Sequence, residues 1–189
     1  VQKVYGVWSG TLVIDDLPLS EDDLIDLSQT LAIKLPELAG EIVTSQLAKT
    51  DNPDSHRKLT FVAPSLSADK SVRDEFFASL GDEQNRNVES WVLAALENIH
   101  HPLRTVQSEE YILASLELLQ EIQVTGDIFF PKRWLDVTLG NYRSGSAVHT
   151  VRTFLDERPD YNRQLRMKIL QSADTMFRAS TIAGADRVQ

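Results

Sequence analysis

The sequence predicts an all-α protein built from antiparallel helix pairs. Apolar residues recur at spacings of three and four along most of its 189 residues. Cap residues or proline begin these periodic segments, and glycine, proline or short polar stretches end them. About nine helices of roughly 8 to 18 residues follow from this pattern. Because short loops join antiparallel neighbours, we expect an armadillo-like or HEAT-like right-handed superhelix and prefer it to a closed bundle.

Residues 1–16 differ from the rest of the chain. They alternate loosely, contain Val, Tyr, Trp, Thr and Ile, and include two glycines. This pattern favours a short extended segment. A lone hairpin is marginally stable, so its apolar residues are expected to need a partner surface. We therefore predict an extended lead-in over 1–16, a helical-repeat-like domain over 17–179 and a frayed tail over 180–189.

The first helices are indicated by their caps. Ser20 is a predicted N-cap followed by three acidic residues, which suit the positive end of the helix dipole. Pro36 ends this helix and opens a second one over 37–49. A turn at 51–54 precedes a short helix over 55–62, and the stretch that begins at Pro64 is expected to be the next break. Ser67 then caps a helix through 80, with Gly81 after it.

The middle of the chain holds the longest apolar pattern. A helix over 88–100 ends at two histidines and a proline. Ser108 is the predicted N-cap of one long helix that continues until Thr125 and Gly126. Pro131 then opens a helix whose inward residues are expected to be Trp134, Leu135, Thr138, Leu139 and Tyr142.

Two helices complete the chain. Ser144 or Ser146 begins the first, and the stretch 158–160 (RPD) ends it. The last helix carries a regular apolar face made by Leu165, Ile169, Ala173, Met176 and Phe177.

The charge distribution disfavours nucleic acid as a partner. The formal net charge is -9. Residues 1–128 carry 22 acidic and 9 basic side chains, whereas residues 129–189 carry 10 basic and 6 acidic ones. The bases of the last third are scattered beside acids along helices and do not form a polybasic arm. No window resembles a membrane-spanning helix, and no signal-peptide pattern opens the sequence, so we expect a soluble chain, either cytoplasmic or exported.

No motif for covalent or metal chemistry is present. The chain has no cysteine, which excludes disulfides and thiolate metal sites, and its four histidines never form H-E-x-x-H. Neither G-x-S-x-G nor a glycine-rich phosphate loop occurs. Adjacent His100 and His101 point about 100 degrees apart on a helix, so we interpret them as a pair that caps helix-end carbonyls rather than as ligands. We expect no catalytic residue, metal ligand or cofactor in this chain.

One cluster of cations is a candidate for facing a ligand. Lys132 and Arg133 precede Trp134, and Arg104 is nearby in sequence. Arginine captures carboxylates in a bidentate manner and stacks on aromatic rings, so Arg104, Lys132 and Arg133 are predicted cleft-facing residues. The alternative is that Lys132 and Arg133 are solvated while Trp134 belongs to the core.

Several short stretches resemble one protein family. They are 100–104 (HHPLR), 115–119 (SLELL), 121–123 (EIQ), 125–131 (TGDIFFP) and 168–171 (KILQ), with 52–54 (NPD), 61–67 (FVAPSLS), 73–77 (RDEFF) and, more weakly, 31–37 (LAIKLPE). In these stretches the chain looks like the C-terminal helical region of a bacterial gluzincin zinc aminopeptidase of the membrane alanyl aminopeptidase family. The resemblance covers about residues 20–179.

The resemblance implies a role but transfers no catalytic residue. It implies a parent enzyme with an N-terminal β domain and a catalytic domain that holds zinc through two histidines and a glutamate. These domains would be the partners of the helical region, which closes over the cleft and limits peptide access. The family's zinc ligands and catalytic glutamate match nothing in this chain. Zinc is therefore expected only in the missing catalytic domain.

Two other functions remain as alternatives. The chain could be a free-standing helical-repeat module that binds a protein or peptide in its groove. It could also be a stand-alone enzyme that uses His100, His101 and nearby acids, although their spacing disfavours this.

Overall fold

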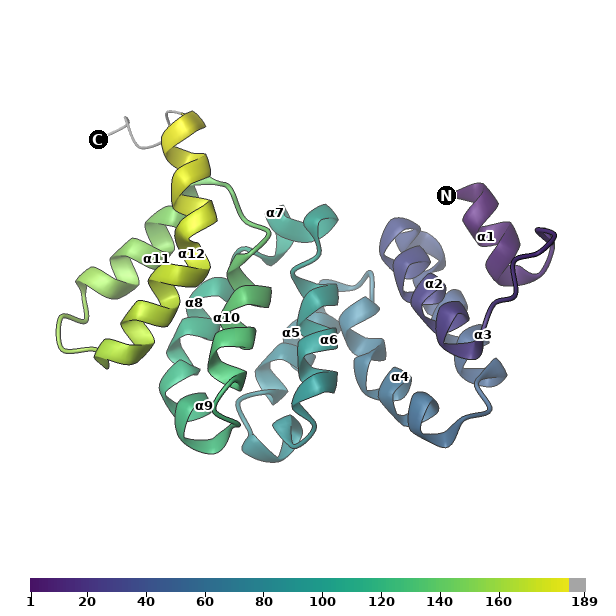
Figure 1. Ribbon diagram of the computed structural model, residues 1–189, viewed down its shortest axis with the longest axis horizontal. Helices are drawn as coiled ribbons and strands as arrows, with labels where there is room; N and C mark the ends of the chain where they lie inside the picture. The colour runs from purple at the N-terminus through teal and green to yellow at the C-terminus, as the bar shows by residue number, and fades with distance from the viewer. Residues whose placement is uncertain (184–189) are drawn as a thin grey trace. The chain divides into compact units, whose positions relative to one another are not determined.

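The computed structural model describes residues 1–183 and is all-α, with 76% helix and no strand in this part of the chain. It contains twelve α-helices and three 3-10 turns over these residues. The chain divides into two compact units, the first formed by Val1–Ser79 and the second beginning at Leu80 (Figure 1).

The first unit contains five α-helices. They are α1 (Gln2–Ser9), α2 (Glu21–Lys34), α3 (Ala39–Lys49), α4 (Pro53–Leu66) and α5 (Lys70–Ser79), with the 3-10 turn η1 (Pro36–Leu38) before α3. Helix α2 packs against α1, α3 and α4, and α4 packs against α5. The prediction of Ser20 as the N-cap of α2 is confirmed, and the structure adds a capping box between Ser20 and Asp23.

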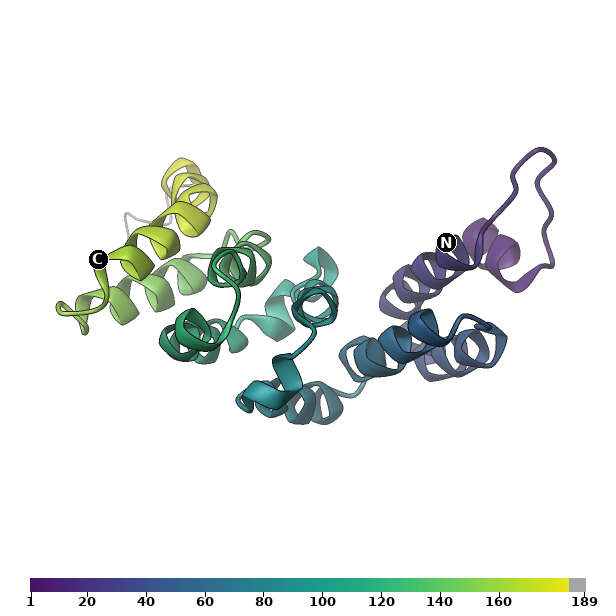
Figure 2. The same ribbon diagram turned by 60° about the horizontal axis from the view of Figure 1, so that its bottom comes forward.

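The prediction of an extended lead-in is wrong for Gln2–Ser9, which form α1. Trp8 on this helix is buried, and its indole N–H donates to Gln46 Oε1 of α3 at 2.7 Å. Burial of an aromatic residue in a tertiary core outweighs the weak strand preference of the local sequence. Gly10 ends α1 in a left-handed conformation, and a long loop then leads to α2 (Figure 2).

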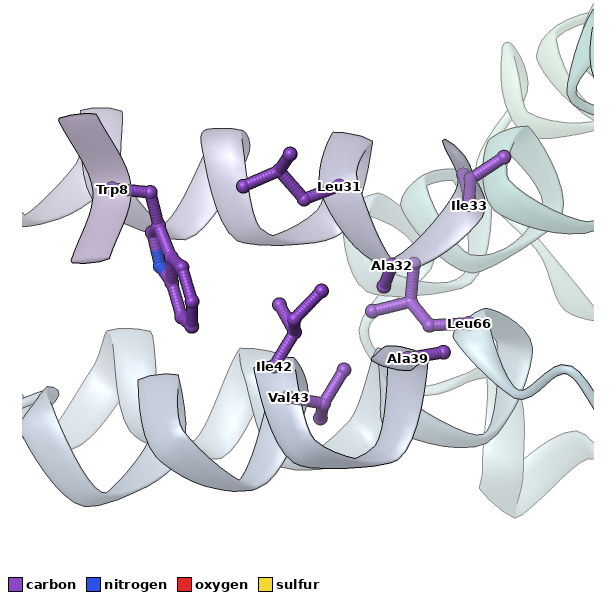
Figure 3. Packing of buried hydrophobic residues seen from close by; sticks show 8 residues of the cluster. All are labelled: Trp8, Leu31, Ala32, Ile33, Ala39, Ile42, Val43 and Leu66. Atoms are coloured by element: carbon purple, nitrogen blue, oxygen red, sulfur yellow. The ribbon is translucent and has the colours of Figure 1, made fainter. Parts of the chain in front are cut away.

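The core of the first unit lies between α1, α2, α3 and the end of α4. Figure 3 shows Trp8 and Leu31 facing Ile42 and Val43 across the space between the helices. The remaining members of this buried cluster are Ala32, Ile33, Ala39 and Leu66.

Helix α4 is longer than predicted because Pro64 does not break it. The helix begins at Pro53, where Asn52 accepts from the backbone N–H of Asp54 and of Ser55. It continues through Pro64 to Leu66. Proline in the last turn costs one hydrogen bond, and Leu59, Val62 and Leu66 are buried on the same helix. Before α5, Asp69 accepts from the Ser71 N–H, so the cap is this residue instead of Ser67.

The second unit contains seven α-helices among its described residues. They are α6 (Glu89–Ile99), α7 (Thr105–Ser108), α8 (Tyr111–Glu117), α9 (Leu119–Thr125), α10 (Phe130–Leu139), α11 (Gly145–Asp156) and α12 (Arg163–Ala183). Two 3-10 turns, η2 (Glu83–Arg86) and η3 (Pro102–Arg104), precede α6 and α7. Residues 184–189 of the predicted tail lie outside the described residues.

Helix α10 takes part in most of the helix packing in the second unit. Helix α10 lies against both α6 and α12, while α11 lies against α8 and α12. The backbone N–H of Asp127, before α10, donates to Glu89 at the start of α6, and Asn141, after α10, donates to His100 at the end of α6. Helices α6 and α10 therefore run parallel. The α8–α9 segment connects them in the opposite direction and packs beside α10 (Figure 1).

The predicted long helix after Ser108 is divided into α8 and α9, and the short helix α7 precedes it. Ser108 lies at the end of α7 and is buried, and its hydroxyl donates to the carbonyl of Ile99 at 2.6 Å. Ser108 is therefore bonded to α6 and is not the N-cap of the next helix. The prediction of Ser144 as a cap is confirmed, since its Oγ accepts from the Ala147 N–H at the start of α11.

Candidate functional site

Lys132 and Arg133 lie in the first turn of α10. The neighbouring side chains of Phe130, Pro131 and Trp134 are buried, so Trp134 belongs to the core. Lys132 forms an ion pair with Asp136 one turn along the helix, and Asp136 also accepts from Ser172 of α12 at 2.7 Å. Arg133 is exposed. The two cations therefore lie on the outer side of α10 while its inner side fills the core.

The corner before α10 is held by α6. Glu89 Oε1 accepts from the backbone N–H of Asp127 at 2.6 Å, and Asp127 Oδ1 accepts from the N–H of Phe129 at 2.8 Å. Three large apolar side chains remain on the surface of this corner: Val124, Ile128 and Phe129 are 85%, 71% and 64% exposed. The start of α10 therefore presents two cations beside an apolar surface.

Arg104 occupies a different environment. It is only 6% exposed, at the end of η3, and its guanidinium donates to the carbonyl of Asn98 in the last turn of α6 at 3.4 Å. Lys132 and Arg133 lie instead at the end of α10 that is next to the start of α6. The structure brings Lys132 and Arg133 together and separates both from Arg104.

Arg104 belongs to a recurring arrangement that the sequence pattern did not reveal. Arg73 donates to the carbonyl of Ser67 at 2.7 Å, and Arg86 donates to the carbonyl of Leu80. Each of these buried arginines lies six residues after its acceptor, as Arg104 does. The acceptors lie at or just beyond the C-terminal ends of α4, α5 and α6, where unsatisfied carbonyls and the negative dipole end favour a cation.

A shallow depression lies between the end of α8 and the loop after α11. Its volume is about 420 Å³, and its lining includes Glu117, Glu157 and Tyr161. Arg158 crosses it, with its guanidinium 4.3 Å from the centre of the Phe154 ring and 3.6 Å from Glu117. Arg158 is already paired with Glu117 and Glu157. We therefore interpret this depression as a surface ion-pair network and not as a ligand site.

His100 and His101 differ from their predicted role. His100 is fully buried, and its Nδ1 shares a hydrogen bond of 2.6 Å with the Tyr142 hydroxyl. Burial lowers the pKa of His100 to about 3. His101 Nδ1 accepts from the backbone N–H of Leu103 and so caps η3. The spacing of His100 from Leu96 already places it on the apolar face of α6, which is the signal that could have indicated its burial.

The described residues contain no group of three or more histidine, aspartate or glutamate side chains that could hold a metal ion. None of the helices over this part of the chain combines the length and the apolar character needed to cross a membrane.

Comparisons with family models, with curated proteins and with solved structures find no match to this chain.

Proposed function

We propose that this chain is the non-catalytic C-terminal helical region of a zinc-dependent aminopeptidase, where it covers the active-site cleft and limits peptide access. The observation that carries the proposal is the resemblance of the stretches between residues 20 and 179, above all 125–131 (TGDIFFP), to that region of the gluzincin aminopeptidases. Its partners would be the catalytic and N-terminal domains of the parent chain, and zinc would be held by the catalytic domain.

The positions of these stretches support a structural role. The stretch 125–131 forms the corner between α9 and α10, where Gly126 approaches Phe130 and Glu89 closely. The stretch 52–54 caps α4, and 100–104 joins α6 to η3. A shared pattern of corners is what related helical scaffolds require, because corners set which helices pack together.

We extend the proposal to the arrangement of the helices. In the second unit, the α8–α9 segment pairs with α10, and α11 pairs with α12. Successive antiparallel pairs that pack in chain order favour an armadillo-like or HEAT-like superhelix. This arrangement would present one helix of each pair toward the cleft of the parent enzyme.

The corner at the start of α10 is the proposed contact surface for the parent. Exposed apolar patches commonly mark sites of contact with other domains or proteins, and Val124, Ile128 and Phe129 form such a patch. Lys132 and Arg133 beside it could contact the carboxylate of a peptide substrate. Arg104 is a weaker candidate, because its guanidinium faces the carbonyl of Asn98 inside its own corner.

The second candidate function is a free-standing helical-repeat module that binds a protein or peptide. It rests on the same exposed corner and on the ordered helix pairs. The reading frame upstream of Val1 distinguishes the two functions. An in-frame H-E-x-x-H with a further glutamate downstream supports the aminopeptidase region, whereas a start codon and ribosome site directly before Val1 support the module.

The direct test measures hydrolysis of aminoacyl anilides by the pure chain with added zinc. We expect no hydrolysis. Robust activity that a chelator abolishes would contradict the proposal.

A second test uses the full-length parent with Lys132→Ala and Arg133→Ala together. We expect a higher KM for longer peptides and an unchanged KM for aminoacyl anilides. Arg178→Ala is the matched control, since Arg178 is an exposed cation paired with Asp174 four residues away on α12. Equal effects on both substrate classes would contradict a cleft-facing role.

A further inference from the structure

The end of α6 holds a buried contact that the proposed function does not use. His100 follows the last residue of α6 and is completely enclosed. Its ring packs edge-on against the rings of Tyr111 of α8 and Tyr142, with centroid distances of 6.2 Å and 5.7 Å. Nδ1 of His100 and the hydroxyl of Tyr142 are 2.6 Å apart. Tyr142 lies in the linker of residues 140–144, which joins α10 to α11.

The same linker has two further attachments. Asn141 Nδ2 donates to the backbone carbonyl of His100 at 3.0 Å. Ser144 Oγ, which also caps α11, donates to Glu109 Oε2 at 2.6 Å. The linker is thus fastened to the end of α6 through His100 and to the segment before α8 through Glu109. Displacing His100 removes two of these three attachments.

The environment of His100 suits only the neutral imidazole. Its Nε2 is buried and has no hydrogen-bond partner among the residues that the structure describes. In the neutral ring, Nδ1 pairs with the Tyr142 hydroxyl and only one uncharged nitrogen, Nε2, is left unpaired. A protonated ring carries a full charge and a second N–H, and burying both without an acceptor is costly.

The surrounding titratable groups do not relieve this cost. Tyr111 and Tyr142 are the ring neighbours, and burial, with the nearby Glu109 carboxylate, raises the pKa of Tyr142. That carboxylate is engaged by Ser144. Arg143 donates to the backbone carbonyls of Gly140 and Tyr142 and adds a positive charge on this side.

We propose that His100 and Tyr142 form an acid-sensitive latch: neutral His100 holds the linker 140–144 on the end of α6, and protonation of His100 releases the linker and the start of α11. The latch does not depend on the proposed function, since it requires only the contacts within the second unit.

The direction of the pH effect follows from the two states of the imidazole. In the closed state the pKa of His100 is lowered to about 3, while in an open, solvated state it returns to about 6.5. The open state therefore binds a proton more readily at pH values between these two. The closed state is fully favoured above pH 6.5, and the opening equilibrium rises by about tenfold per pH unit below it.

The test is amide hydrogen exchange of the full chain at pH 7.5 and pH 5.0, expressed as protection factors so that the intrinsic pH dependence of exchange is removed. We expect protection at Tyr142, Ala147 and Val148 to fall by about 30-fold. Protection inside α6, at residues 92–96, should fall much less. Equal protection at the two pH values overturns the latch. An equal loss inside α6 also overturns it, because the whole unit would then be opening.

Two variants distinguish the effect of protonating His100 from a general loss of protection at low pH. His100→Gln keeps a side chain that can donate and accept but cannot titrate, so the 30-fold change should disappear. His149→Gln is the matched control, since His149 is exposed on α11 of the same unit and its variant should retain the change.

Tyr142→Phe provides an independent test if His100→Gln does not fold. This variant removes only the hydroxyl that contacts His100. Protection of Ala147 and Val148 should then be lower already at pH 7.5. Unchanged protection in Tyr142→Phe at pH 7.5 overturns the assignment of the pair as the fastening contact.

Discussion

Trp134 is the largest fully buried side chain of the protein. It packs edge-on against Phe130 at 6.0 Å, and its indole N–H donates to the carbonyl of Ser115 at 3.2 Å. Its place on α10 was predictable from the apolar period, but its partner was not. The hydrogen bond to Ser115 depends on how the α8–α9 segment returns beside α10, and this is a tertiary property.

Trp134→Ala should destabilise the second unit by about 3 to 5 kcal/mol, because it leaves a large cavity and an unpaired carbonyl. The free energy of unfolding from urea titration measures this effect. The control is Arg133→Ala at the exposed neighbouring position, where we expect a change within about 0.5 kcal/mol. If the free energy of unfolding of Trp134→Ala falls by less than about 1 kcal/mol, the neighbouring side chains fill the space that Trp134 leaves. That result would contradict the central role of this side chain in the core.

Arg86 combines the carbonyl contact of the arginine arrangement with an ion pair. Its side chain is 3% exposed, contacts the carbonyl of Leu80 and pairs with Glu121 of α9. Arg86→Met should destabilise the second unit by about 1 to 3 kcal/mol, because the buried carbonyl of Leu80 loses its donor. Arg178→Met, which removes an exposed pair, should change stability by at most about 0.5 kcal/mol. Similar shifts in the urea midpoints of the two variants would argue against the capping role.

At the scale of elements, helix positions were easier to predict than helix ends. The periodic segments at α2, α6, α10, α11 and α12 form helices as expected. The predicted break at Pro64 failed because the loss of one hydrogen bond in a last turn is small compared with burial of Leu66. The predicted long helix after Ser108 begins only at Tyr111, because Ser108 is bonded to Ile99 at the end of α6, and it is interrupted at Leu118.

The corner between α9 and α10 depends on a glycine for steric reasons. A Cβ at Gly126 would lie 2.7 Å from Phe130 Cδ1 and 2.9 Å from the carbonyl oxygen of Ile122. Gly126→Ala should therefore cost about 1 to 3 kcal/mol, which thermal or urea unfolding can measure.

Gly40→Ala is the control for this substitution. A Cβ at Gly40, in the first turn of α3, meets nothing within 4 Å. The added methyl group restricts the unfolded chain, so we expect stabilisation of about 0.4 to 1 kcal/mol. If both substitutions destabilise the protein, the need for glycine at position 126 would come from the flexibility of its backbone and not from contacts with Phe130 and Ile122.

At the scale of the whole molecule, the chain has two compact units, and the buried cluster from Trp8 to Leu66 belongs to the first. Each unit has its own fluorescent reporter, since Trp8 lies in the first unit and Trp91 and Trp134 lie in the second. This division was not expected from a length of 189 residues, for which we predicted one helical domain.

The two units should unfold at different urea concentrations, because each is a compact unit with many internal contacts of its own. In Trp8→Phe, fluorescence reports the second unit alone, while far-UV circular dichroism reports both. We expect the circular dichroism transition to be broader than the fluorescence transition and to have a different midpoint. Coincident transitions would contradict independent unfolding.

The sequence by itself determined the all-α class, most helix cores and the absence of a recognisable catalytic motif. These properties follow from local periodicity and residue chemistry, which act within one or two turns. The tertiary structure decided that Gln2–Ser9 form a helix, that Arg104 is buried and apart from Lys132, and that His100 meets Tyr142. Residues 42 positions apart come together only when helices pack, so no local pattern could have indicated that contact.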